Sequence, residues 1–360
     1  MLYELFYSLQ EFYSPFNVFR YITFRTALAV ITALVITFAL SPWIIRELRR
    51  LSMTQHVRDD GPRTHLNKTG TPTMGGILII LSVVISVLMW GDLSNKFVLI
   101  MIAAISGFGI IGLVDDYLKA VRKNPKGLRG WYKFGAQIIL ALAIGFLFYN
   151  DPNDNYVAQL SIPFFKQWFI DLGWFYIPFS VLVIVGSSNA VNLTDGIDGL
   201  AIGLVGIASL ANAALVYISG HAIFSQYLYV PYLPGTGELT VFCGAMFGAA
   251  LGFLWFNSYP AEIFMGDVGS LGLGGALGTL AVITKQEIVL AVVGGIFVLE
   301  TFSVIIQVAS FKLTGRRVFK MAPIHHHFEE KGWPEPKVIV RFWIAGIILA
   351  LLSLATLKVR

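Results

Sequence analysis

The sequence predicts an all-α, polytopic integral membrane protein with about ten transmembrane helices, and three observations support this prediction. Of the 360 residues, 56% are hydrophobic and only 13% are charged, about half the charged share of a soluble globular domain. The mean hydropathy is +0.72. Apolar runs of about 20 residues recur along the chain, and each is long enough to cross the hydrocarbon as a helix. A transmembrane barrel would instead show alternating segments of about ten residues.

The expected helices follow these apolar runs, and both termini are expected on the periplasmic side. The first run follows no basic stretch and precedes no small-residue cleavage site, so we expect this helix to be retained rather than removed as a signal peptide. No internal repeat is visible, and residues 1–360 are expected to form a single transmembrane catalytic domain. The expected helices are 25–46, 72–91, 95–115, 132–149, 168–188, 199–219, 236–256, 262–283, 288–308 and 338–358.

Lys and Arg are concentrated in three expected loops, and this sets the orientation of the chain. Segments 46–71, 116–133 and 309–337 carry six each, or 18 of the 26 in the chain. With ten helices these segments fall on one side, which the positive-inside rule makes cytoplasmic. We therefore expect the chemistry on the cytoplasmic face. The expected catalytic loops lie near 46–72, 115–133, 187–199, 257–267 and 309–337.

Carboxylates at the cytoplasmic ends of expected helices are the candidate catalytic and metal-binding groups. Asp115 and Asp116 end one apolar run, and Asp267 begins a Gly-rich helix. A carboxylate at membrane depth costs about 2.5–3.5 kcal/mol on insertion scales, and it is tolerated where it faces a polar cavity or a partner. Asp115 has a simpler alternative, an i,i+4 ion pair with Lys119. The helix N-terminus at Asp267 also favours a bound anion near residues 266–270.

The segment 189–200, NAVNLTDGIDGL, has a polar residue at every third position from its start. On a helix these residues would form one polar stripe, and no Lys or Arg accompanies them. Carboxylates without a local cation indicate a metal, a basic loop or a cationic ligand nearby; an acidic loop in water is the alternative. The stripe consists of Asn189, Asn192, Asp195 and Asp198.

Two further segments carry groups suited to phosphate. Lys68 and Thr73 lie in HLNKTGTPTMGG, which also suits a juxtamembrane loop drawn to anionic lipid. The segment MAPIHHHFEE has three adjacent histidines, which in a loop can donate to phosphate or to base edges. A solvated loop and a zinc site are the alternatives, but neither HExxH spacing nor a Cys cluster supports zinc. The histidines are His325, His326 and His327.

Carboxylates and basic loops thus converge on one face. Mg²⁺ commonly binds one or two carboxylates and lets substrate phosphates complete its shell, while basic side chains hold those phosphates. The sequence therefore predicts Mg²⁺-assisted phosphoryl transfer between a lipid phosphate and a soluble nucleotide. A secondary transporter or lipid flippase is the competing hypothesis, but it would place ionisable groups near the midplane, often in repeated halves. No GxxxxGK[ST] motif occurs, and no nucleic-acid partner is expected.

The motifs KTGTPTMGG, LVDDYLK, NAVNLTDGIDGL, FNSYPAEIFMGDVGS and PIHHHFE together resemble those of the phospho-N-acetylmuramoyl-pentapeptide-transferases. The resemblance runs from about residue 20 to the C-terminus. It implies transfer from UDP-MurNAc-pentapeptide to undecaprenyl phosphate, giving lipid I and UMP, at the inner membrane of a bacterium. It also implies Mg²⁺ as cofactor and a homodimer. A sister transferase that uses UDP-N-acetylglucosamine is the alternative, although the HHHFE form resembles the muramoyl branch more.

The resemblance also assigns roles to residues. Asp267 resembles the Mg²⁺-binding residue, Asp115 resembles a proposed base for the lipid phosphate, and Asp116 would assist. We expect all three to lie within reach of the metal. The substrate-binding residues are expected to be Lys68, Thr73, Lys119, Lys133, Asn189, Asn192, Asp195, Asp198, Asn257, His325, His326 and His327.

Overall fold

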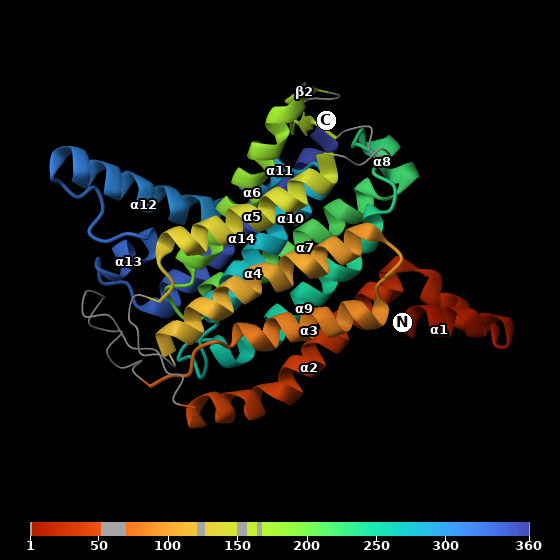
Figure 1. Ribbon diagram of the computed structural model, residues 1–360, viewed down its shortest axis with the longest axis horizontal. Coiled ribbons are helices and arrows are strands. Elements are labelled where there is room, and N and C mark those ends of the chain that lie inside the picture. Colours follow the sequence, from red (N-terminus) through yellow and green to blue (C-terminus); the bar gives the residue numbers. More distant parts are fainter. Residues whose placement is uncertain (1, 52–69, 121–126, 150–156, 164–167, 360) are drawn as a thin grey trace.

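The computed structural model confirms a polytopic all-α membrane protein (Figure 1). It describes residues 2–51, 70–120, 127–149, 157–163 and 168–359. Within these ranges, nine helices are long and apolar enough to span a membrane, and α3 (Gly76–Trp90) is apolar but shorter. The long helices are α2 (Ile22–Arg50), α4 (Lys96–Ala120), α5 (Gly130–Tyr149), α6 (Tyr176–Thr194), α7 (Leu200–Ser219), α9 (Leu239–Asn257), α10 (Gly266–Ile283), α12 (Gly295–Thr314) and α14 (Glu335–Val359).

Each of the ten expected helices has a counterpart, but three differ from expectation. The helix expected over 168–188 begins only at Tyr176, because residues 169–171 pair antiparallel with 159–161. The helix expected over 288–308 is divided at Gly294, and consecutive glycines have low helix propensity. The helix expected to begin at residue 262 begins at Gly266, since backbone groups of Phe264 and Met265 bond to the 72–76 segment instead.

Short elements complete the described chain. They are α1 (Leu2–Ser8), η1 (Leu9–Glu11), η2 (Ser14–Arg20), β1 (Gln159–Ser161), β2 (Phe169–Asp171), η4 (Gly173–Phe175), α8 (Ala222–Leu228), η5 (Thr236–Glu238), α11 (Glu287–Val293) and α13 (Ile324–Glu329). Helix α13 contains the three histidines, so the expectation that they lie in a loop was wrong. A short helix points consecutive side chains in different directions, and this separates the three rings.

Helix α10 lies at the centre of the bundle. Every residue from Val268 to Ile283 is buried, among α3, α4, α6 and their neighbours. Small residues permit this close packing: a Cβ placed on Gly76 of α3 would lie 2.0 Å from the backbone nitrogen of Gly269. The first turn of α10, which carries Asp267, is thereby held between several other helices.

The chain before α10 is anchored by backbone hydrogen bonds. Phe264 donates its N–H to the carbonyl of Pro72 at 2.8 Å, and Gly75 donates to Phe264 at 2.9 Å. Gly76 then donates to the carbonyl of Met265 at 2.8 Å. The KTGTPTMGG motif and the residues before Asp267 are therefore one unit, although they are far apart in sequence.

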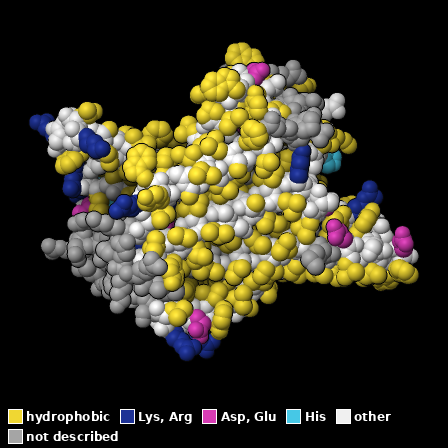
Figure 2. Space-filling view, in the orientation of Figure 1, with side chains coloured by type: hydrophobic (Ala, Val, Ile, Leu, Met, Phe, Trp, Pro, Cys, Tyr) yellow, Lys and Arg dark blue, Asp and Glu magenta, His cyan; other side chains and the backbone are white. Residues whose placement is uncertain are grey.

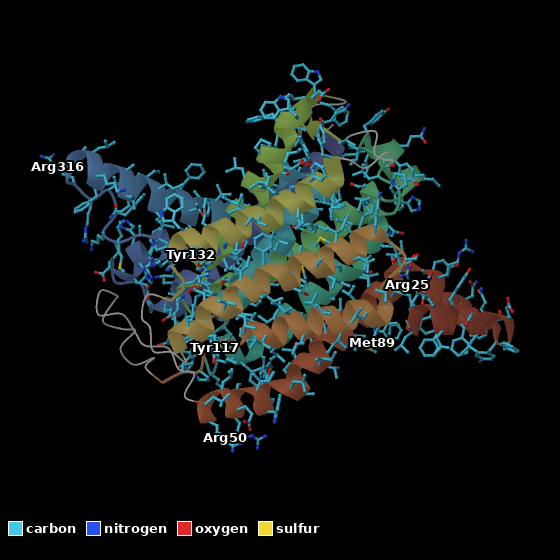
Figure 3. All side chains as sticks on the ribbon, in the orientation of Figure 1. Arg25, Arg50, Met89, Tyr117, Tyr132 and Arg316 are labelled. Atoms are coloured by element: carbon cyan, nitrogen blue, oxygen red, sulfur yellow. The ribbon has the colours of Figure 1, made fainter. Side chains whose placement is uncertain are left out.

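The three basic segments of the sequence, so far as they are described, lie at one end of the bundle. In Figure 3, Arg50, Tyr117 and Tyr132 lie at the left-hand ends of their helices and Arg316 lies just beyond the left-hand end of α12, whereas Arg25 and Met89 lie at right-hand ends. Both termini lie away from the left-hand end (Figure 1). Hydrophobic side chains cover much of the surface between the two ends (Figure 2). The left-hand end is the one that the positive-inside rule assigns to the cytoplasm.

Candidate active site

Asp267 is the hub of a cluster at the left-hand end of the bundle. Its Oδ2 accepts from Lys119 Nζ at 2.8 Å and from Lys133 Nζ at 2.7 Å. Its Oδ1 accepts from Asn192 Nδ2 at 2.8 Å. Four helices thus meet at this carboxylate, since these partners come from α4, α5 and α6.

Asp115 shares both lysines with Asp267. Its Oδ2 lies 2.8 Å from Lys119 Nζ and 3.1 Å from Lys133 Nζ. Its Oδ1 accepts the backbone N–H of Leu128 at 2.7 Å. The i,i+4 pair with Lys119 is therefore present, but it is one contact of a network with two cations rather than a solvated helix end.

Asp116 caps the N-terminus of α10. Its Oδ2 accepts the backbone N–H of Val268 at 3.1 Å. The anion expected near this helix N-terminus is thus, in the structure, the Asp116 carboxylate. Gly266 lies beside it with φ +72°, and a Cβ there would lie 2.6 Å from Asp116 Oδ2 and 3.0 Å from Thr73 Oγ1. Only glycine adopts this conformation readily, so it allows these groups to approach.

The five side chains that meet here form what we call the carboxylate–lysine cluster. Its carboxylates and ammonium groups come from α4, α5 and α10, with Asn192 and Thr73 at its edge. The cluster consists of Asp115, Asp116, Lys119, Lys133 and Asp267.

The polar stripe of the sequence divides between helix and loop. Asn189 and Asn192 lie on α6, which ends at Thr194, and the stripe then continues on the 195–199 loop. Asn189 donates to Gln137 Oε1 of α5 at 2.7 Å. Asn192 also donates to Ser270 Oγ at 2.8 Å, so it joins α6 to the first turn of α10.

Asp195 directly follows α6, three residues after Asn192, which donates to Asp267. Burial raises the pKa of Asp195 to about 8, and the nearby carboxylates of Asp267 and Asp116, then Asp198, add to the effect. Its ionised form is therefore disfavoured unless a cation arrives.

Asp198 and Asn257 hold backbone segments together. Asp198 Oδ2 accepts the N–H of Ala261 at 3.0 Å. Asn257 Oδ1 accepts the N–H of Gly199 at 3.1 Å, and its Nδ2 donates to the carbonyl of Ile263 at 2.8 Å. Both side chains thus fix the 195–199 loop against the chain that leads into α10.

The three histidines have three different environments. His325 is fully buried, with Nδ1 3.1 Å from Glu300 Oε1, and its Nε2 would lie 2.3 Å from a Cβ on Gly196. His326 Nδ1 lies 2.7 Å from Glu329 Oε2, and its Nε2 would lie 3.4 Å from the same Cβ.

His327 lies in a different direction. Its Nδ1 accepts the N–H of Lys320 at 3.1 Å, and its ring packs edge-on against Phe319. The structure thus places His325 and His326 at the 195–199 loop and His327 against the segment before α13. The predicted site residue Lys68 lies outside the described residues.

Sequence reasoning missed several side chains that support the site. Gln137, Ser270 and Glu335 contact the predicted residues, and Glu335 Oε1 accepts the N–H of Asp198 at 2.9 Å. Glu300 had a usable signal, since it is a carboxylate inside an expected membrane helix.

The chain is similar in sequence to several known transferases. The family model described as glycosyl transferase family 4 matches residues 98–285, and phospho-N-acetylmuramoyl-pentapeptide-transferase signature 1 matches residues 68–80. A phospho-N-acetylmuramoyl-pentapeptide-transferase of Thermodesulfovibrio yellowstonii is 69% identical over 361 residues and covers 100% of both chains. Those of Citrifermentans bemidjiense and Geobacter sp. are each 58% identical over the full length of both chains.

The chain belongs to the phospho-N-acetylmuramoyl-pentapeptide-transferase family. It is therefore a lipid I-forming transferase of peptidoglycan synthesis, and a multi-pass protein of the bacterial inner membrane. Within this transferase, the family model covers the helices that carry Asp115, Asp116 and Asp267, and the signature covers Thr73. These relatives are named as members of the muramoyl branch and not of the branch that uses UDP-N-acetylglucosamine.

Proposed function

We propose that the carboxylate–lysine cluster transfers phospho-MurNAc-pentapeptide from UDP-MurNAc-pentapeptide to undecaprenyl phosphate, and that the transfer depends on Mg²⁺. The observation that carries this proposal is the meeting of Asp115 and Asp267 with two lysines at one end of a membrane bundle. A lipid phosphate reaches this end from the bilayer, and a soluble nucleotide reaches it from the cytoplasm.

Phosphoryl transfer requires positioning and charge neutralisation more than covalent catalysis by the protein. An oxygen of the lipid phosphate attacks the phosphorus attached to the sugar, and a new P–O bond forms. The bond from that phosphorus to the bridging oxygen of UDP breaks, and UMP leaves with the electron pair. A phosphate monoester has a second pKa near 6, so the attacking oxygen is largely ionised at neutral pH. Lys119 and Lys133 are placed to hold the phosphates, and Asp115 fixes both ammonium groups.

The donor set of the cluster fits Mg²⁺. In the described ranges, no three or more His, Cys, Asp and Glu side chains form a preformed metal site. Mg²⁺ does not need one, because it commonly uses one or two carboxylates together with phosphates and water. Burial is the main cause of the raised pKa of Asp195, and repulsion from Asp267 and Asp116 adds to it; a divalent cation relieves such repulsion. Asp267 would hold the ion with Asp115 or Asp116, and the ion would neutralise charge on the diphosphate.

The 195–199 loop and α13 form the donor side of the proposed site. Asn192, Asp195 and the two histidines at Gly196 offer amide, carboxylate and imidazole groups within one short stretch. A nucleotide sugar presents hydroxyls, base edges and phosphates, which these groups match. Asp198, Asn189 and Asn257 hold this stretch in place, so we assign them supporting contacts.

One assay tests the proposal as a whole. Purified protein in detergent is given undecaprenyl phosphate with either UDP-MurNAc-pentapeptide or UDP-N-acetylglucosamine, with Mg²⁺ or with EDTA. We expect UMP release and a lipid product, identified by mass, only with the muramoyl donor and Mg²⁺. Full turnover in EDTA would contradict the Mg²⁺ proposal, and equal use of both donors would contradict the assigned donor.

A further inference from the structure

A glutamate inside the membrane bundle contacts one of the histidines. Glu300 of α12 and His325 of α13 are both fully buried, and Glu300 Oε1 lies 3.1 Å from His325 Nδ1. Glu300 Oε2 also accepts the backbone N–H of His325 at 3.5 Å. A carboxylate on a membrane-spanning helix is costly, and it usually marks a functional partner.

The contact between Glu300 and His325 Nδ1 influences whether the other ring nitrogen, Nε2, acts as a hydrogen-bond donor or acceptor. A carboxylate beside Nδ1 favours a proton on that nitrogen and fixes the plane of the ring. His325 Nε2 is then the nitrogen that faces outward from the pair. It is buried and, like Nδ1 and Glu300 Oε1, has no hydrogen-bond partner within the described part of the chain; the 3.1 Å approach of Nδ1 to Oε1 is an ion-pair contact. A buried polar atom without a partner is costly, so a ligand that supplies one binds favourably.

The direction of Nε2 identifies where that ligand lies. The ring approaches the 195–199 loop so closely that a Cβ on Gly196 would lie 2.3 Å from Nε2. This loop adjoins the carboxylate–lysine cluster, because Asn192, three residues before Asp195, donates to Asp267 Oδ1 at 2.8 Å. His325 Nε2 is therefore aimed at the donor side of the proposed site.

We propose that Glu300 is a positioning residue for the donor substrate: through His325 Nδ1 it holds the imidazole so that Nε2 contacts UDP-MurNAc-pentapeptide. Glu300 does not touch the substrate itself. The inference rests on the proposed function, because that function places His325 at the donor side. Helix α13 lies close to α12 (Figure 1), and the pair also anchors α13 to the bundle.

The experiment measures donor affinity directly, by calorimetry with UDP-MurNAc-pentapeptide and no lipid acceptor. Glu300→Ala should weaken donor binding about 10- to 100-fold, because it removes a buried charged group that contacts the imidazole and leaves the ring unpositioned. Glu300→Gln keeps an oxygen acceptor and should lie between wild type and Glu300→Ala. In turnover assays, the KM for undecaprenyl phosphate should change less than threefold in both variants.

Two comparisons separate positioning from a merely structural role. The double variant Glu300→Ala/His325→Ala should bind the donor no more weakly than His325→Ala alone, since both changes remove one contact. Glu287→Gln is the matched control, because Glu287 is also buried and bonds to Tyr176, near the end that carries β1 and β2. It should lower thermal stability without changing donor affinity.

Several results would overturn the inference. They are unchanged donor affinity in Glu300→Ala, equal losses for donor and acceptor, and a double variant whose loss is the product of the single losses. A different result would contradict the Mg²⁺ proposal alone. If wild-type protein binds the donor but transfers without Mg²⁺, the proposed role of Glu300 is unaffected. Wild-type protein that does not bind the donor would overturn both.

Discussion

Lys133 Nζ lies 2.7 Å from Asp267 Oδ2, although the two residues are 134 positions apart in the chain. The same ammonium lies 3.1 Å from Asp115 Oδ2, so one cation joins α4, α5 and α10. The side chains of Lys133 and Asp267 are only 17% and 16% exposed. Water therefore screens this contact less than it screens a surface ion pair.

Replacing Lys133 by Met tests the role of this cation. Met keeps an unbranched apolar stem but removes the charge, so the phosphates lose one of two ammonium groups. We expect kcat to fall about 100-fold, as for other positioned charge-stabilising groups. Lys96→Met is the control, because Lys96 lies at the start of α4, whereas the carboxylate–lysine cluster lies at the end of α4. This variant should keep normal turnover. A loss of less than threefold in Lys133→Met would remove Lys133 from the mechanism.

Replacing Gly196 by Ala tests the close approach of α13 to the 195–199 loop. The new Cβ would lie 2.3 Å from His325 Nε2, so either the ring or the loop must move. We expect at least a tenfold loss of kcat/KM for the donor, since small displacements in a site cost rate strongly. Gly186→Ala is the matched control, because a Cβ there meets nothing within 4 Å.

Gly196→Ala should also change the stability of the protein. If the clash with His325 is the cause, Gly196→Ala/His325→Ala should melt at a higher temperature than Gly196→Ala alone. Activity of Gly196→Ala equal to that of Gly186→Ala would show that the loop does not need this approach.

Replacing Asp195 by Asn tests the repulsion among the carboxylates. Burial and neighbouring carboxylates raise the pKa of Asp195 from 3.8 to about 8. The folded protein then holds this proton more tightly than the unfolded chain, so wild-type stability falls as pH rises between these values and is level above them. Asn cannot ionise and avoids this loss. In EDTA, the melting temperature of Asp195→Asn should therefore gain on wild type by a few degrees between pH 5 and pH 8.

Activity of the same variant should move in the opposite direction. Asp195 lies on the donor side of the proposed site, so its loss should lower kcat/KM about tenfold or more. A difference in melting temperature that is the same at pH 5 and pH 8 would contradict the raised pKa.

The sequence predicted the helices well because membrane helices leave a strong local signal. Among the described residues, the ten apolar runs correspond to nine helices long enough to span a membrane and the shorter α3, and the three basic segments, so far as they are described, end at one side of the bundle. The break at Gly294 and the pairing of 159–161 with 169–171 were missed, because both depend on contacts that no apolar run reveals. The orientation in a bilayer and the homodimer stay predictions.

The sequence predicted that these charged residues would cluster, but it did not predict which groups pair with each other. Asp115, Asp116 and Asp267 were identified because carboxylates at membrane helix ends are costly, and the structure brings them together with Lys119 and Lys133. Which group pairs with which depends on how remote helices pack, and one sequence does not contain that information. For the same reason, the division of the histidines between the 195–199 loop and the segment before α13 was not foreseen.

The central claim is that Asp267 organises the transfer, and Asp267→Asn tests it most directly. Asn keeps the shape but loses the charge that two lysines share and that the proposed Mg²⁺ would need. We predict that UMP release from UDP-MurNAc-pentapeptide falls at least 1000-fold, on the order of removing a principal charge-stabilising group, in protein that still elutes as a single species. Asp171→Asn, in β2 at the opposite end, should keep normal release. Release by Asp267→Asn within tenfold of wild type at saturating Mg²⁺ would contradict the account.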